Sequence, residues 1–207
     1  MFKKILYVLS SVFCFVAVSA TATAASFEQD PKELVVAVSQ KTFEEISKNK
    51  ENLDDIEFAK KLIEEQLLPY IDTKYASYKV IGVNLKKTTE AQRDRFTKAF
   101  TNYIVLTYAT ALKKYTNQTL EFPQDVVDKN DKVASVRVVM KTEASPDIEL
   151  IFKLRKNTKT GFWKVYDMVA EGISLLSAKQ SELSGLIRDK GIDEVSKMLE
   201  NHEIKEQ

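Results

Sequence analysis

The sequence is poor in cysteine, histidine, glycine and proline. Its 207 residues include one cysteine, one histidine, five glycines and four prolines. Cys14 lies in an apolar N-terminal run that we expect to be removed, so the mature chain would have no disulfide and would depend on its core alone. The scarcity of glycine and proline argues against long flexible linkers or a low-complexity domain.

The same absences exclude several kinds of chemistry. A Ser-His-Asp triad, a Cys-His pair and a histidine-based metal site each need a histidine placed among other functional side chains. The one histidine of this chain, His202, lies in a polar tail close to the C-terminus. Neither a G-x-x-x-x-G-K-[ST] nor a G-x-G-x-x-G motif is present. We therefore expect no metal and no cofactor.

The charges are nearly balanced, with 31 Lys and Arg residues against 30 Asp and Glu residues. A nucleic-acid-binding protein normally has a clear basic excess, so we expect no nucleic-acid partner. The hydrophobic fraction of 44% and the charged fraction of 29% are ordinary for a globular protein. The length fits one domain, residues 25–207, which we expect to be a monomer.

Residues 1–24 have the three parts of a bacterial signal peptide. Lys3 and Lys4 give a basic start, residues 5–18 form an apolar run, and Ala22-Thr23-Ala24 fits the cleavage rule. The run is shorter than the roughly 20 apolar residues of a membrane span. We expect cleavage before Ala25 and export to the periplasm; the alternative is an uncleaved N-terminal anchor.

Periodicity predicts helices on both sides of a set of strands. Asp30 before Pro31, and Thr89 followed by Gln92, have the pattern of helix starts, and Gly191 is a candidate helix end. The predicted helices span residues 31–49, 54–68, 70–83, 89–115, 173–189 and 193–204, and the predicted strands span residues 119–127, 132–142, 147–155 and 161–169. The fold class is thus α+β, with a twisted antiparallel sheet of about four strands wrapped by N- and C-terminal helices.

Alternation along the strands predicts a sheet with one apolar face. Val136 and Val138 share a side of their strand opposite Arg137, and Leu150 and Phe152 do the same in the next strand. Such a face needs a cover, which the helices can supply. A solid core and an apolar cavity give the same sequence pattern, so the alternation leaves both open.

Two carboxylates offer the best route to an enzyme. Asp167 and Glu171 stand near the end of the last predicted strand, where a carboxyl group in apolar surroundings can act as an acid. A hydrolase that uses this pair is therefore one hypothesis. The alternative is that these carboxylates pair with an arginine or cap the following helix.

The C-terminal half carries a specific signature. Residues 161–175, GFWKVYDMVAEGISL, closely resemble the signature of the MlaC family, also called the toluene-tolerance family. Residues 67–72, LLPYID, resemble a second family landmark, and the aromatic residues of the 89–115 helix fit as well. The resemblance covers essentially the whole mature chain.

The resemblance implies a function in lipid transport. Members of this family are periplasmic carriers in the system that maintains outer-membrane lipid asymmetry. The expected partners are a glycerophospholipid ligand, an outer-membrane lipoprotein–porin complex and an inner-membrane ABC transporter with its MCE-domain subunit. We therefore expect this chain to be a carrier and not an enzyme. A further alternative is an adaptor that bridges the membrane complexes without lipid cargo.

We expect the acyl chains to lie in an apolar cavity between the sheet and its helical cover. Parity and periodicity place the 89–115 helix in that cover, with other residues closing one end. The candidate lipid-binding residues are Leu67, Tyr70, Ile81, Phe96, Phe100, Tyr103, Ile104, Tyr108, Val136, Val138, Leu150, Phe152, Leu154, Trp163 and Val165.

Overall fold

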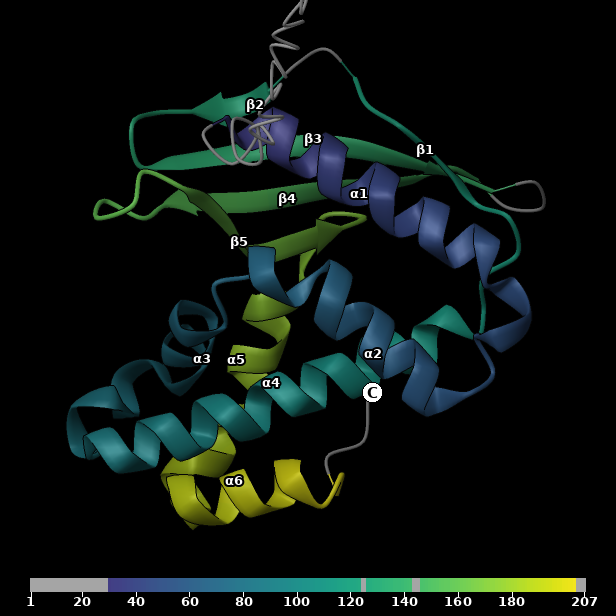
Figure 1. Ribbon diagram of the computed structural model, residues 1–207. Coiled ribbons are helices and arrows are strands. Elements are labelled where there is room, and N and C mark those ends of the chain that lie inside the picture. The colour runs from purple at the N-terminus through teal and green to yellow at the C-terminus, as the bar shows by residue number, and fades with distance from the viewer. Residues whose placement is uncertain (1–29, 124–125, 143–145, 204–207) are drawn as a thin grey trace, which may run out of the picture.

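A sheet and a group of helices form the two ends of the molecule, and one helix crosses a face of the sheet (Figure 1). The structure is a computed structural model that describes residues 30–123, 126–142 and 146–203. Helices come first in the chain, strands follow, and two helices end it, which is the α+β arrangement that the sequence predicted. The predicted signal peptide lies outside the described residues.

The N-terminal helices begin at the residues that their capping patterns predicted. Asp30 Oδ1 accepts hydrogen bonds from the backbone N–H groups of Lys32 (2.9 Å) and Glu33 (3.1 Å). Thr89 and Gln92 form a reciprocal capping box at the start of the longest helix. The helical segments are α1 Pro31–Lys48, η2 Lys50–Asn52, α2 Ile56–Gln66, η3 Leu68–Tyr70, α3 Thr73–Ile81, η4 Gly82–Lys87 and α4 Glu90–Leu112.

The helix predicted over residues 70–83 is shorter than expected. Tyr70 belongs to the separate turn η3, and Asp72 caps α3 by accepting from the Tyr75 N–H at 3.0 Å. Gly82 ends α3 with φ 57°, a left-handed conformation that residues with a Cβ rarely adopt. The chain therefore enters a 3-10 turn instead of continuing the helix.

The sheet is antiparallel throughout the described residues, with the order β1-β3-β4-β5-β6, and β2 pairs with β3 as well. The predicted strand over residues 119–127 is two short strands, because Pro123 lacks the N–H that a continuous ladder needs. The others match β3, β4 and β5. The strands are β1 Thr119–Glu121, β2 Val126–Lys129, β3 Val133–Lys141, β4 Ile148–Lys156, β5 Trp163–Ala170 and β6 Ile173–Ser174.

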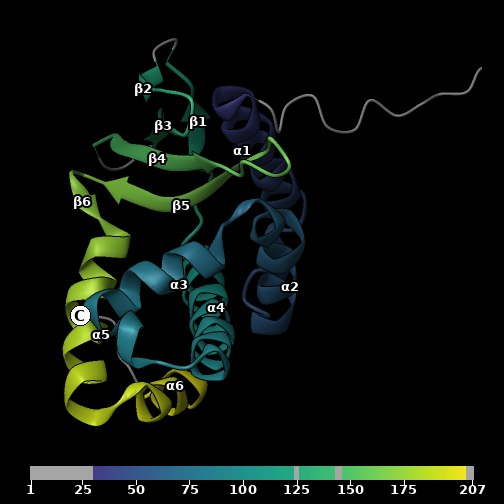
Figure 2. The ribbon, with the colours of Figure 1, turned by 90° about the vertical axis from the view of Figure 1, so that its left-hand side faces the viewer.

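The two faces of the sheet differ in polarity, as the alternation predicted. Val136 and Val138 are buried on the face that α1 covers. On the opposite face Arg137 Nε lies 3.4 Å from Glu149 Oε2. Figure 2 shows α1 lying against the sheet while the other helices gather beyond its β5 edge. One helix thus supplies most of the cover.

The remaining helices pack on one another around α4. After the sheet come α5 Leu175–Lys190 and α6 Ile192–Glu200, separated by Gly191 with φ 85°. No helix in the described ranges is both long enough and apolar enough to cross a bilayer. These helices enclose a group of buried residues that we call the helical core: Ala76, Val80, Ile81, Phe96, Ala99, Phe100, Tyr103, Leu183, Ile187, Ile192, Val195 and Leu199.

A short stretch between η3 and α3 connects the helices to the sheet. Ile71 pairs with Val165 of β5, and the Asp72 N–H donates to the Val165 carbonyl at 2.7 Å. Arg155 Nη1 of β4 donates to Asp72 Oδ2 at 2.9 Å. Asp72 therefore caps α3 and binds the sheet with the same side chain.

Asp72 should matter more for stability than an ordinary helix cap. We expect Asp72→Ala to lower the free energy of unfolding by about 2 kcal/mol, since it removes a cap and a charge-assisted hydrogen bond that is partly exposed. Asp55→Ala removes only the cap of α2 and should cost about 1 kcal/mol. Urea denaturation followed by circular dichroism measures both, and equal losses would contradict the connecting role of Asp72.

Candidate functional site

The apolar side of the sheet and the facing side of α1 form one group of side chains, which we call the sheet–α1 cluster. Its centre is buried and its border is partly exposed. The buried members are Leu34, Val35, Ala134, Val136, Val138, Leu154 and Trp163. The partly buried members are Val38, Tyr70, Leu120, Phe122, Leu150, Phe152 and Val165. The cluster thus combines buried apolar side chains with large ones that stay partly exposed to solvent.

Local sequence accounts for both sides of the cluster. Leu34 and Val38 stand four residues apart on α1, which puts them on one face of the helix. On β4, Leu150, Phe152 and Leu154 alternate with residues of the polar face. The two periodicities therefore present apolar stripes to each other.

A β-bulge in β5 sorts its residues between the two faces. Leu154 of β4 pairs with Val165 of β5. One step further, Lys153 pairs with Asp167, which leaves Tyr166 as the extra residue. Val165 consequently belongs to the sheet–α1 cluster, whereas Asp167 forms its contacts on the polar face.

The fifteen candidate lipid-binding residues fall into three groups. Tyr70, Val136, Val138, Leu150, Phe152, Leu154, Trp163 and Val165 lie in the sheet–α1 cluster. Ile81, Phe96, Phe100, Tyr103 and Ile104 lie in or against the helical core. Leu67 and Tyr108 pack where α2 meets α4.

The expectation that the 89–115 helix covers the sheet is wrong. In the structure α4 packs on α2, α3 and α6, and the rings of Phe96 and Phe100 stack at 5.9 Å inside the helical core. Helix α1 covers the sheet instead. Sequence reasoning thus missed the members Leu34, Val35 and Val38, although the apolar stripe of residues 31–48 was a signal for them.

An open groove adjoins the sheet–α1 cluster. It has a cavity volume of about 380 Å³ and runs between α1 and residues 115–122. Leu120 and Phe122 belong both to the groove and to the cluster border. Phe43 and Tyr115, which both line it, meet edge to face with ring centres 6.2 Å apart. The groove therefore gives solvent access to one border of the cluster.

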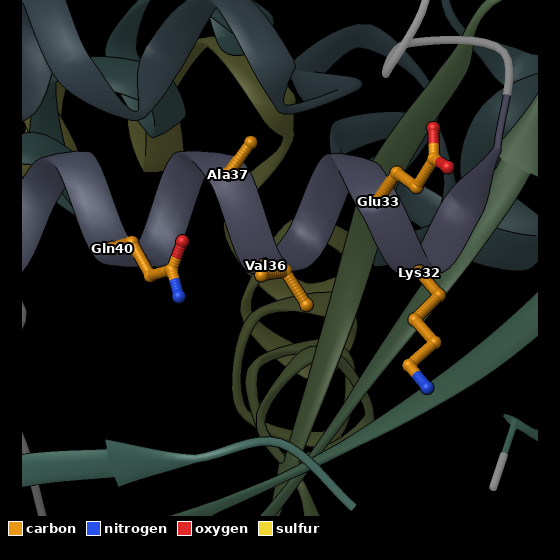
Figure 3. A pocket seen from close by; sticks show the side chains of 5 residues that line it. All are labelled: Lys32, Glu33, Val36, Ala37 and Gln40. Carbon is orange, nitrogen blue, oxygen red and sulfur yellow. The ribbon is translucent and has the colours of Figure 1, made fainter. Parts of the chain in front are cut away.

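A second depression, of about 510 Å³, is lined by residues of α1 alone. Figure 3 shows its side chains, Lys32, Glu33, Val36, Ala37 and Gln40, spread along the helix. The lining mixes two charged residues with two small apolar ones. It is an open surface feature that shares Gln40 with the groove beside the cluster.

Asp167 and Glu171 contact different groups. Asp167 is nearly buried and accepts from the Ser174 hydroxyl (2.7 Å) and from the Leu176 N–H (3.0 Å). Glu171 Oε1 accepts from the Glu149 N–H at 2.7 Å. Asp167 therefore helps to cap α5, as the alternative to the hydrolase hypothesis predicted, and Glu171 ties the β5–β6 turn to β4.

An aromatic cluster flanks the connection on the polar face. The guanidinium of Arg155 lies 4.2 Å from the centre of the Tyr75 ring, and Tyr75 meets Tyr166 edge to face at 5.2 Å. Burial raises the pKa of the Tyr166 hydroxyl, and the neighbouring Tyr75 raises that pKa further. Tyr166 therefore stays neutral at physiological pH and serves packing.

Comparison with known proteins decides the family. Residues 36–201 match the family model described as MlaC protein. A protein of Haemophilus influenzae, named intermembrane phospholipid transport system binding protein MlaC, is 33% identical over 193 residues, which is 92% of this chain and 89% of that protein.

The chain belongs to the MlaC family.

A solved structure has the same fold as this MlaC-family chain. It is the phospholipid-binding protein of Ralstonia solanacearum in complex with a phospholipid, with a TM-score of 0.73 and 19% sequence identity. The match covers 82% of this chain and 94% of that one. At this identity the likeness concerns the fold alone, and it agrees with the α+β class that the sequence predicted.

The contacts of Asp167 predict a graded loss of stability. We expect Asp167→Ala to lower the free energy of unfolding by about 2 kcal/mol, because two partly buried donors lose their acceptor. Asp167→Asn keeps one acceptor oxygen and should cost about 1 kcal/mol. Chemical denaturation of both variants tests this, and a native-like Asp167→Ala would show that the carboxylate does not hold α5.

Proposed function

We propose that this chain is a periplasmic phospholipid carrier. It holds the acyl chains against the sheet–α1 cluster and moves lipid between an outer-membrane lipoprotein–porin complex and an inner-membrane ABC transporter with its MCE-domain subunit. The observation that carries the proposal is an apolar sheet face closed by one helix and bordered by half-buried large side chains. Family membership and the lipid-bound fold neighbour support it.

The physical need for a carrier follows from the cost of exposing lipid tails. Two acyl chains of about 16 carbons contain roughly 30 methylene groups, and each costs about 0.8 kcal/mol to expose to water. The total is on the order of 25 kcal/mol, so unaided diffusion across an aqueous gap is negligible. A carrier must offer an apolar surface that replaces the bilayer.

The sheet–α1 cluster is the proposed surface. Leu150, Phe152 and Val165 are already partly exposed at its border, so tails that insert beside them meet apolar groups at once. Movement of α1 away from the sheet would lengthen the apolar track to the buried centre. The candidates in the helical core pack on one another, so we assign acyl contact first to the members of the sheet–α1 cluster.

The groove beside the cluster is the proposed entrance. Its lining includes polar Gln40, Ser47 and Gln118 and acidic Glu44, but neither lysine nor arginine. The lining therefore offers no side-chain cation that could pair with a phosphate. We therefore propose that the headgroup stays in water at this groove and that headgroup selectivity is weak.

The proposed location and energetics follow from the sequence. The signal-peptide pattern of residues 1–24 supports export to the periplasm and a mature domain of residues 25–207. No nucleotide-binding motif is present in the sequence, so we propose that the energy for directional transport comes from a partner. The chemistry supported here is binding and release.

One strand offers a matched test of the lipid site. We expect purified wild-type protein to contain phospholipid, and Leu150→Glu to reduce the lipid content at least tenfold, since a carboxylate at the cluster border is costly against acyl chains. Ile151→Glu places the same charge on the polar face of the same strand and should retain lipid. Solvent extraction and mass spectrometry, with circular dichroism to check folding, measure the difference.

Two outcomes would overturn the proposal. Wild-type protein that is purified without lipid, and that takes up none from vesicles, would favour an adaptor without cargo. Folded Leu150→Glu protein with a full complement of lipid would show that the tails lie elsewhere.

A further inference from the structure

The turn η4, residues 82–87, presents an apolar side chain almost entirely to solvent. Val83 is 88% exposed, compared with 63% for Ile173 and 38% for Val133, the other exposed large apolar residues of the described chain. Burial of a valine side chain is favourable, and Val83 gains little of this stabilisation in the isolated chain.

The turn is held in this position by its neighbours. Asn84 is buried and donates from Nδ2 to the Ser184 carbonyl of α5 at 3.2 Å. Leu85 packs against the helical core, and its carbonyl accepts from the Thr88 hydroxyl at 2.8 Å. Because the two residues that follow Val83 are anchored inwards, the turn holds Val83 in an exposed position.

Two lysines, Lys86 and Lys87, follow the exposed valine in the same turn. Lys86 and Lys87 are exposed, and within the described part of the chain neither forms an ion pair, although Glu90 follows closely in the sequence. Other exposed lysines of this chain do find carboxylates, such as Lys48 with Glu44 at 2.7 Å. The turn therefore combines a protruding apolar group with uncompensated positive charge.

We propose that η4 is a docking surface for a protein partner that offers a small apolar depression bordered by Asp or Glu side chains. The complementary charges would steer the encounter, and burial of Val83 would hold it. A fixed turn with one protruding side chain fits a shaped protein surface better than a fluid bilayer, for which a single valine is a weak anchor.

The surface lies away from the proposed lipid site. The turn connects α3 to α4 at the helical end, whereas the sheet–α1 cluster lies at the other end (Figures 1 and 2). A partner bound at η4 would leave the border of the cluster and its groove uncovered. Docking and lipid exchange can therefore proceed together, an arrangement that rests on the proposed carrier function.

The chain provides a matched control for the charges. Lys113 and Lys114 form a second exposed lysine pair at the far end of the same helix α4. With 23 residues, that helix separates the two pairs by about 35 Å. The double substitutions K86E/K87E and K113E/K114E thus change the net charge equally at two distant places.

The experiment measures sedimentation of the purified protein with native membrane fragments from the producing bacterium, and with protein-free vesicles of lipids extracted from them. We expect K86E/K87E and Val83→Asp to weaken binding to the native fragments at least tenfold, and K113E/K114E to change it less than twofold. Binding to protein-free vesicles should be the same for all four proteins. A photoreactive residue at position 83 should crosslink to a protein.

Each other outcome overturns the docking surface. Equal losses for the two lysine pairs would indicate general charge attraction, and unchanged binding would show that η4 is not used. Equal losses on protein-free vesicles would make the bilayer the occupant. The lipid content of the purified variants distinguishes failure of the docking proposal from failure of the proposed carrier function. The η4 variants should contain the wild-type amount of lipid whether or not η4 binds a partner.

Discussion

The apolar face of the β3–β4–β5 sheet is the constraint on which the rest of the structure depends. Alternation puts Val136, Val138 and Leu154 on one side, and exposure of that side to water would be unfavourable by about 25 cal/mol for each Å². Something must cover it. In this structure α1 does so, and the partly exposed border shows that one helix covers the centre better than the edges.

A one-residue irregularity keeps charge out of that apolar layer. Without the bulge at Tyr166, strict alternation from Val165 would turn the Asp167 carboxylate towards the sheet–α1 cluster. With it, Asp167 contacts Lys153 and the start of α5. The same residue that would have placed a charge in the apolar layer thus anchors the start of α5.

Two of the hydrophobic clusters among the described residues, the helical core and the sheet–α1 cluster, differ in how completely they are buried. The helical core is closed by large side chains that are almost fully buried, such as Phe96, Phe100 and Leu183. The sheet–α1 cluster has a buried centre and a loose border. Asp72 and Arg155 connect the two. The helical core thus buries its large side chains more completely than the sheet–α1 cluster does.

Local signals in the sequence determined the helices, the strands and the family. Caps at Asp30 and Thr89, and the period-two pattern of β3 and β4, involve residues within a few positions of each other, so they can be read without a fold. Much of the candidate site followed from them, because parity alone identifies the apolar face of each strand. The signature in residues 161–175 added the family.

Only the tertiary structure decided which helix covers the sheet and where the bulge falls. The stripes of α1 and α4 are both apolar, and either satisfies the hydrophobic requirement, so the choice rests on chain connections and packing between distant residues. The bulge at Tyr166 is likewise a matter of register with β4, which strand periodicity does not contain. Leu34 and Val35 belong to the candidate site because they pack against strand residues about a hundred positions later in the chain. The sequence around them does not contain that information.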